Sequence, residues 1–228
     1  MSERLDSALV SQGLVPSRER AKELIKSGNV TVNGKTQSKP SVNVTAEDKL
    51  EVIGGQLKYV GRAGLKLEKA AKVFEISFKD KVCADIGAST GGFTDCLLQQ
   101  GASKVFAIDV GYGQLDWKIR SDPRVVVMER TNVRYVTPEQ LGEPLDLSVI
   151  DVSFISLKIV LPVIKTFLKP TGQVLCLIKP QFEAGKEKVG KKGVVRDPKI
   201  HQMVLDNFVS LVDGLGFKIL GLTFSPVK

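Results

Sequence analysis

Histidine and cysteine are scarce in this sequence of 228 residues. His201 is the only histidine, and Cys83, Cys96 and Cys176 form no Cys-x-x-Cys pair. A zinc site and a histidine-based catalytic triad are therefore not expected. Each cysteine lies in or beside an apolar run, so we expect buried thiols that stay reduced.

Long apolar runs are also missing. No stretch approaches the roughly 18 apolar residues that a membrane-spanning helix needs. The first residues lack the charged-then-apolar pattern of a secretion signal. We therefore expect a cytoplasmic protein that does not engage a membrane.

Positive charge exceeds negative charge, and the excess is uneven along the chain. The net charge is +8. Residues 81–168 contain nine basic and ten acidic side chains, a net −1, whereas residues 169–228 contain ten and five, a net +5. Such a distribution favours a polyanionic partner, although many solvated surfaces are equally basic.

Residues 1–55 predict a small α+β domain. Helices are expected at 3–10, where apolar residues share one face, and at 18–27, where Ser17 can cap the first turn. Residues 30–32 alternate like a strand before the turn Asn33-Gly34, and further short strands fit at 41–44 and 49–53. A core this small suits the binding of a partner better than chemistry.

The second of these helices carries a row of cations. Arg18, Lys22 and Lys26 recur at every fourth position, which indicates either a solvated face or a contact with phosphates.

A resemblance to a known family favours phosphate contacts over a solvated helix face. It is carried by Arg4-Leu-Asp, Gly13-Leu, Ser17-Arg18-x-x-Ala21, Ile25-x-x-Gly28-x-Val30-x-Val32-Asn33-Gly34 and Lys39-Pro40. This order and spacing resemble the RNA-binding domain named for ribosomal protein four of the small subunit. The resemblance implies that RNA phosphates are contacted by Arg4, Arg18, Arg20, Lys22 and Lys26.

Residues 61–228, after a linker at 56–60, predict an α/β domain of the Rossmann-like kind. Strand-like runs at 82–86, 105–110, 125–128, 145–150, 174–178 and 218–224 alternate with helical patterns, best at 155–168 and 199–215. This alternation indicates a mostly parallel sheet with helices on both faces. Ligands of such sheets bind at the carboxyl ends of the strands.

The first of these runs ends in a glycine-rich loop that begins at Gly87 and is preceded by Asp85. Asp109 follows the second run, 22 residues after Gly87, where a carboxylate can bind the hydroxyls of a ribose. The pattern G-x-x-x-G-G and the acid before it favour S-adenosylmethionine over a dinucleotide. A loop of purely structural glycines is the remaining alternative.

Two charged residues lie at the expected ligand edge, and a third precedes the sheet. Asp151 ends the fourth run and Lys179 the fifth, while Lys66 lies just before the sheet begins. A lysine at a strand end is commonly only solvated, but the neighbouring acid favours a functional group.

This part of the chain is similar to the ribose 2′-O-methyltransferases of the FtsJ type. The order Ala88-Ser-Thr-Gly91-Gly92-Phe93-Thr94, Asp109-Val-Gly-Tyr-Gly-Gln-Leu, Asp151-x-Ser-Phe-Ile-Ser and Lys179-Pro-Gln-Phe-Glu closely resembles the TlyA-type haemolysin-like proteins, which methylate cytidine 2′-hydroxyls of ribosomal RNA. The resemblance implies catalysis by Lys66, Asp151 and Lys179 without a metal. It implies a cofactor site formed by Asp85, Gly87, Ser89, Gly91, Gly92, Phe93, Asp109, Val110, Asn132 and Asp151.

The resemblance also implies two features for which we find no counterpart. The family's fourth catalytic residue, a glutamate, and its last strand would follow Lys228, so residues 61–228 are expected to lack the C-terminal strand.

Phe154 has two interpretations, stacking on the target base or packing in the core.

The expected partner is ribosomal RNA or a ribosomal subunit rather than DNA or a membrane. Two other functions compete with methylation. One is a non-catalytic RNA-binding or ribosome-assembly factor with a retained methyltransferase fold. The other is a membrane-acting haemolysin, against which the absence of a long apolar or strongly amphipathic segment argues.

Overall fold

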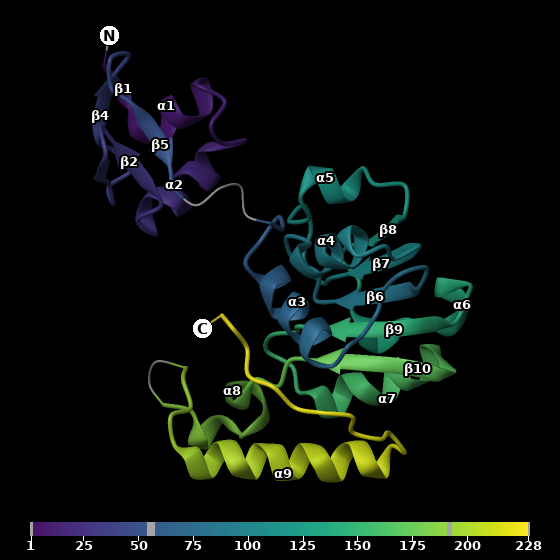
Figure 1. Cartoon of the computed structure of the whole chain (residues 1–228). Coiled ribbons are helices and arrows are strands. Elements are labelled where there is room, and N and C mark those ends of the chain that lie inside the picture. Colours follow the sequence, from purple (N-terminus) through teal and green to yellow (C-terminus); the bar gives the residue numbers. More distant parts are fainter. Residues whose placement is uncertain (1, 54–57, 191–192, 228) are drawn as a thin grey trace. The chain divides into compact units, whose positions relative to one another are not determined.

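The computed structural model describes residues 2–53, 58–190 and 193–227, which divide into two compact units, Met1–Lys58 and Tyr59–Lys228 (Figure 1). Residues 56 and 57 of the expected linker lie outside the described residues. Each unit has its own hydrophobic core.

The first unit packs two helices against short antiparallel strands. Strand β1 (Ser2–Arg4) pairs with β4 (Asn43–Thr45), and β2 (Val30–Val32) pairs with β3 (Lys35–Thr36) and β5 (Leu50–Val52). Helices α1 (Leu5–Ser11) and α2 (Arg18–Lys26) bury one face each. Ser17 accepts a hydrogen bond from the main-chain N–H of Arg20, as expected of an N-cap. The core consists of Leu5, Leu9, Ala21, Ile25, Val30 and their neighbours.

The second unit contains a parallel sheet of five strands in the order β10-β9-β6-β7-β8. These are β6 (Val82–Ile86), β7 (Lys104–Ile108), β8 (Val125–Met128), β9 (Leu145–Ile150) and β10 (Leu168–Cys176). The predicted mostly parallel sheet is confirmed. Because β6 lies between β7 and β9, the chain order reverses there, and the carboxyl end of β6 is the place where sheets of this kind bind ligands.

Helices cover both faces of this sheet (Figure 1). One face packs against α3 (Ala63–Val73), α4 (Gly92–Gln99) and the short α5 (Trp117–Arg120). The other packs against α7 (Leu157–Phe167) and α9 (Pro198–Gly214), the two helices that the sequence predicts most clearly. The shorter elements α6 (Pro138–Leu141), α8 (Pro180–Glu183), η1 (Val133–Tyr135) and η2 (Lys186–Lys188) connect them.

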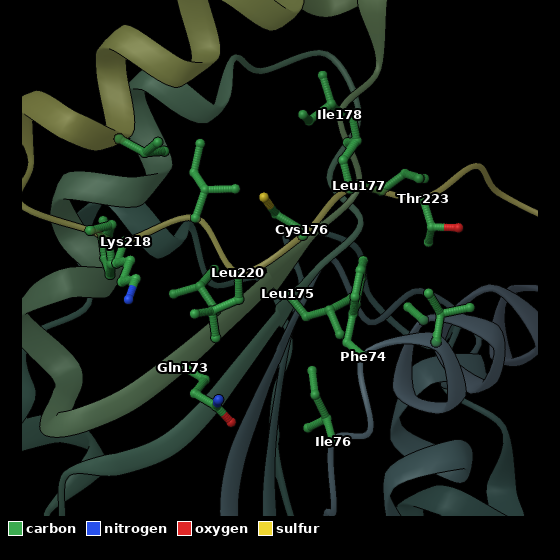
Figure 2. A pocket seen from close by; sticks show the side chains of 18 of the residues that line it. Phe74, Ile76, Gln173, Leu175, Cys176, Leu177, Ile178, Lys218, Leu220 and Thr223 are labelled. Atoms are coloured by element: carbon green, nitrogen blue, oxygen red, sulfur yellow. The ribbon is translucent and has the colours of Figure 1, made fainter.

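The prediction of a strand at 218–224 is wrong. Its residues form no strand in the structure, and Leu220, Leu222 and Phe224 are exposed. A groove of about 730 Å³ separates this segment from β10; Leu175 and Cys176 line it from β10, and Leu220 from the other side (Figure 2). Apolar alternation predicts a half-buried strand, but a strand also needs a hydrogen-bonding partner, and β10 pairs only with β9 in the described residues.

A buried acid joins the sheet to α4. Asp85, in β6, has no exposed surface, and its Oδ2 accepts hydrogen bonds from the main-chain N–H (2.9 Å) and the hydroxyl (2.7 Å) of Thr94. The other oxygen, Oδ1, makes no hydrogen bond within the described part of the chain. Burial therefore raises the pKa of Asp85 to about 7. The hydrogen bonds between Asp85 and Thr94 hold the two ends of the glycine-rich loop together.

Replacing this acid by its neutral isostere tests the account of its burial. The folded state favours the protonated form, so the wild-type protein loses stability as pH rises from about 4 through about 7. Asp85→Asn avoids that loss and can keep both bonds to Thr94. We expect the free energy of unfolding of Asp85→Asn, relative to wild type, to rise by up to about 4 kcal/mol between pH 4 and 8.

Urea denaturation at several pH values measures this difference. Asp213→Asn removes an exposed carboxylate from α9 and serves as the control. A difference that does not change with pH would contradict a buried, protonated Asp85.

Candidate functional site

One carboxylate holds two lysines at the carboxyl edge of the sheet. Lys66 Nζ, from α3, lies 2.8 Å from Asp151 Oδ2, and Lys179 Nζ lies 2.7 Å from Asp151 Oδ1. The side chains of Lys66, Lys179 and Asp151 are 22%, 18% and 12% exposed. The structure thus brings together three residues that the sequence places 85 and 28 positions apart.

The charges in this group outweigh the cost of burial. Burial alone would raise the pKa of Asp151, but hydrogen bonds from Lys179 and Lys66, and their positive charges, hold the pKa of Asp151 below its usual value. Asp151 is therefore an anion at neutral pH. Two ammonium groups on one carboxylate leave the cluster with a single positive charge.

The loop after Asp151 extends this group. Lys179 Nζ donates a hydrogen bond to Ser153 Oγ (3.0 Å). Phe154 is 92% exposed, so it does not pack in the core, and its φ of 64° is in the left-handed region that a bulky residue rarely adopts. Its ring lies 5.1 Å from the ring of Phe182, in α8. A hollow of about 440 Å³ beside the lysines is lined by Arg62, Lys66, Lys179, Gln181 and Ser225 among others.

The glycine-rich loop packs directly against this group. Gly87 has φ 83°, and a Cβ there would lie 2.9 Å from the main-chain oxygen of Asp151. Gly91 has φ 92° and precedes the first turn of α4. Only glycine allows this conformation together with so close an approach. The loop and Asp151 are therefore neighbours, as a shared ligand site requires.

Asp109 supports the loop from β7. Its Oδ2 accepts a hydrogen bond from Ser89 N–H (2.8 Å) and its Oδ1 one from Gly111 N–H (2.6 Å). These residues line a small hollow together with Gln114. The carboxylate, the loop and the hollow form the part of the site that could hold a polar, hydroxylated ligand.

The other residues expected to contact a cofactor are placed differently. Val110 is exposed, directly after Asp109, and Asn132 caps η1 by accepting a hydrogen bond from Arg134 N–H. Phe93 is buried in the core and lines the groove beside β10 instead of the hollow at Asp109. A Cβ at Gly92 would meet Ala63 at 3.1 Å, so this glycine lets α4 pack closely on α3.

In the first unit, two of the expected RNA-binding arginines share one acid. Asp6 is fully buried, and Arg4 (2.9 Å) and Arg18 (3.1 Å) both bind its carboxylate. The hydrogen bond from Arg4, helped by Arg18, lowers the pKa of Asp6 to about 2. Both arginine side chains remain about half exposed. They are thus fixed in place with surface left to contact a ligand.

The other three residues expected to bind RNA, Arg20, Lys22 and Lys26, differ in whether an ion pair constrains them. Arg20 pairs with Glu23 at 2.5 Å, whereas Lys22 and Lys26 have no ion pair within the described residues. In the row of cations Arg18, Lys22 and Lys26, the arginine is therefore held by Asp6, whereas the two lysines are available to a partner.

Sequence reasoning missed the residues that support the lysines and the loops. Ser153 binds Lys179, and the carboxylate of Glu183 accepts hydrogen bonds from Ser156 Oγ (2.6 Å) and Leu157 N–H (2.9 Å). Both lie in motifs that resembled a family, so the signal was present. Their partners, however, are remote in sequence and follow only from the fold.

Two features of the described ranges concern the metal site and the membrane segment that the sequence does not predict. No group of three or more metal-ligating His, Cys, Asp or Glu side chains occurs there. No helix there is long and apolar enough to cross a membrane.

Known proteins match the chain along its whole length. Residues 59–228 match the family described as FtsJ-like methyltransferase, and residues 3–50 match the S4 domain. YqxC of Bacillus subtilis, a candidate rRNA methyltransferase by name, is 54% identical over 99% of this chain and 80% of its own. The Mycobacterium tuberculosis protein named 16S/23S rRNA (cytidine-2′-O)-methyltransferase TlyA is 44% identical over 98% of this chain and 84% of its own.

A solved structure has the same fold. The candidate hemolysin from Streptococcus thermophilus superimposes with a TM-score of 0.78, at 46% identity, over 100% of this chain and 83% of its own. Three quarters of the chain match the methyltransferase family, and the lysine-carboxylate group and the glycine-rich loop lie within that part. The chain therefore belongs to the FtsJ-like methyltransferase family and carries an S4 domain before the methyltransferase domain.

Proposed function

We propose that this protein transfers a methyl group from S-adenosylmethionine to a ribose 2′-hydroxyl of ribosomal RNA. The observation that carries the proposal is the pair of lysines on Asp151, next to the glycine-rich loop at the carboxyl edge of the sheet. The names of the relatives point to the same reaction, since TlyA of Mycobacterium tuberculosis is named for cytidine 2′-O-methylation of rRNA.

The residues around the loop fit this cofactor. The Asp109 carboxylate, held by Ser89 N–H, suits the two hydroxyls of its ribose, and Gly87 and Gly91 let the main chain lie close to it. Asp85 Oδ1 has no hydrogen-bond partner within the described residues and lies near the end of β6; a cationic amino-acid group bound beside it would favour the ionised form of Asp85. When bound, the cofactor supplies an activated methyl group.

The lysine pair and Asp151 prepare the nucleophile. A ribose hydroxyl attacks poorly until its proton is removed. The ammonium group of Lys179 must first release a proton to solvent, and the resulting amine then accepts the hydroxyl proton at Nζ. Lys66, on the other oxygen of Asp151, helps to hold the pKa of Asp151 below its usual value. Asp151 and Ser153 together fix the position of Lys179 Nζ. Side chains of this chain thus accept the proton and balance the charge, and we assign no role to a metal ion.

Incubation with methyl-labelled S-adenosylmethionine and each ribosomal subunit tests the proposed function. We expect label in rRNA that remains in an alkali-resistant dinucleotide, because a 2′-O-methyl group blocks hydrolysis of the next phosphodiester. Label that alkali treatment releases in mononucleotides would indicate methylation of the base. Absence of label would favour a non-catalytic RNA-binding factor.

Lys179→Ala removes the proposed base. We expect the single-turnover rate of methyl transfer to fall by roughly 10²–10⁴-fold, because general-base catalysis contributes a factor of this size. Cofactor binding should persist, since Asp109 and the loop are unchanged; calorimetric titration checks this. Lys72→Ala, an exposed lysine of α3, is the control and should react like wild type. A Lys179→Ala variant of normal rate would refute the assignment.

Lys22 and Lys26 of α2 are the S4-domain lysines that we propose bind RNA phosphates. Substituting both with alanine should weaken RNA binding equally for different sequences, because phosphates carry no sequence information. The slope of log affinity against log salt should become shallower by about 1–2, as expected for two lost contacts. Fluorescence anisotropy at several salt concentrations measures the slope.

The matched control removes the same charge elsewhere. Lys72→Ala combined with Lys79→Ala takes two exposed lysines from the methyltransferase domain. An equal change of slope in both double variants would show that net charge, and not the α2 face, determines binding.

A further inference from the structure

Two loops carry the side chains of the proposed reaction. Asp151 and Ser153 lie in the loop between β9 and α7, whereas Lys179 lies in the connection between β10 and α8. The proposed proton transfer needs Lys179 Nζ to keep its position relative to the first loop. What fixes the two loops relative to each other therefore bears directly on the reaction.

Glu183 joins the two loops away from the lysines. It is the last residue of α8, and its Oε2 accepts a hydrogen bond from Ser156 Oγ at 2.6 Å. Its Oε1 accepts one from the main-chain N–H of Leu157 at 2.9 Å. Ser156 is the N-cap of α7 and itself accepts from Lys158 N–H. The carboxylate thus satisfies a free N–H at the positive end of α7, where a negative charge is stabilised.

The bonds of Glu183 differ from the contacts that Lys179 makes between the two loops. The ion pair of Lys179 with Asp151 and the bond to Ser153 both change when Lys179 gains or loses a proton. The bonds of Glu183 involve neither lysine, so they persist in both protonation states of Lys179. They can hold the loops in place while the proton moves.

The conformation of Phe154 is a second observation. Its left-handed backbone, φ 64°, lies between Ser153, which is bound to Lys179, and Ser156, which is bound to Glu183. A bulky residue keeps such a conformation only where its surroundings enforce it. The loop is therefore anchored at both ends by the segment that carries Lys179.

We propose that Glu183 is a positioning residue for methyl transfer, which aligns the Asp151–Ser156 loop with Lys179. The proposal rests on the proposed function. It assigns Glu183 no contact with the reacting atoms; its effect passes through Ser156 and Leu157.

Two substitutions separate this role from a general contribution to folding. Glu183→Ala removes both bonds, and we expect kcat to fall about tenfold or more while the Kd for S-adenosylmethionine changes less than about twofold. Glu183→Gln can still accept from Leu157 N–H and can donate its amide to Ser156 Oγ, so it should retain most of the wild-type kcat. Glu187→Ala, an exposed acid four residues later, is the control and should match wild type.

Hydrogen exchange gives a readout that does not need activity. Exchange of the peptide covering residues 151–157 should accelerate in Glu183→Ala but not in Glu183→Gln or Glu187→Ala. Normal kcat in Glu183→Ala, or a loss of kcat and cofactor binding together that Gln does not rescue, would overturn the proposal. A wild-type protein that methylates no RNA would instead refute the proposed function, and the exchange data would still decide whether Glu183 orders the loop.

Discussion

A single carboxylate facing two ammonium groups is the interaction on which the methyltransferase domain is organised. Asp151 could not stay buried and ionised alone, because desolvation would favour its neutral form. Lys66 and Lys179 compensate for that cost, and each comes from a different element. The parallel pairing of β9 with β10 brings Asp151 and Lys179 to one edge of the sheet, while α3 supplies Lys66. Gly87 then lets the glycine-rich loop lie against the main chain of Asp151.

The S4 domain uses a related arrangement for a different purpose. Asp6 is fully buried and holds Arg4 and Arg18, as Asp151 holds two lysines. Removing one partner of such a group leaves an uncompensated buried charge, which is strongly destabilising. In the S4 domain the acid presents two guanidinium groups at the surface. In the methyltransferase domain the acid fixes two amines beside the glycine-rich loop, and we propose that one of them exchanges a proton with the substrate.

Much of this arrangement could be predicted from the sequence, and the rest depends on pairing between remote segments. Asp151 and Lys179 each follow an apolar strand run, so their place at one sheet edge follows from the parallel alternation. Lys66 lies in a helix, and only the family resemblance singled it out. The segment expected as a strand at 218–224 has the right alternation but pairs with no strand among the described residues. The link from Glu183 to Ser156 has no local signal, because α8 and α7 meet only in the folded chain.

The central claim is that Lys179, held by Asp151, receives the proton of the target ribose. A structure of the protein with S-adenosylmethionine and an RNA fragment containing the methylated nucleotide tests it most directly. The account predicts the target 2′-oxygen within hydrogen-bonding distance of Lys179 Nζ, with Lys66 and Lys179 still on opposite oxygens of Asp151. A complex in which the 2′-oxygen contacts neither lysine, or in which the two lysines leave Asp151, would contradict it.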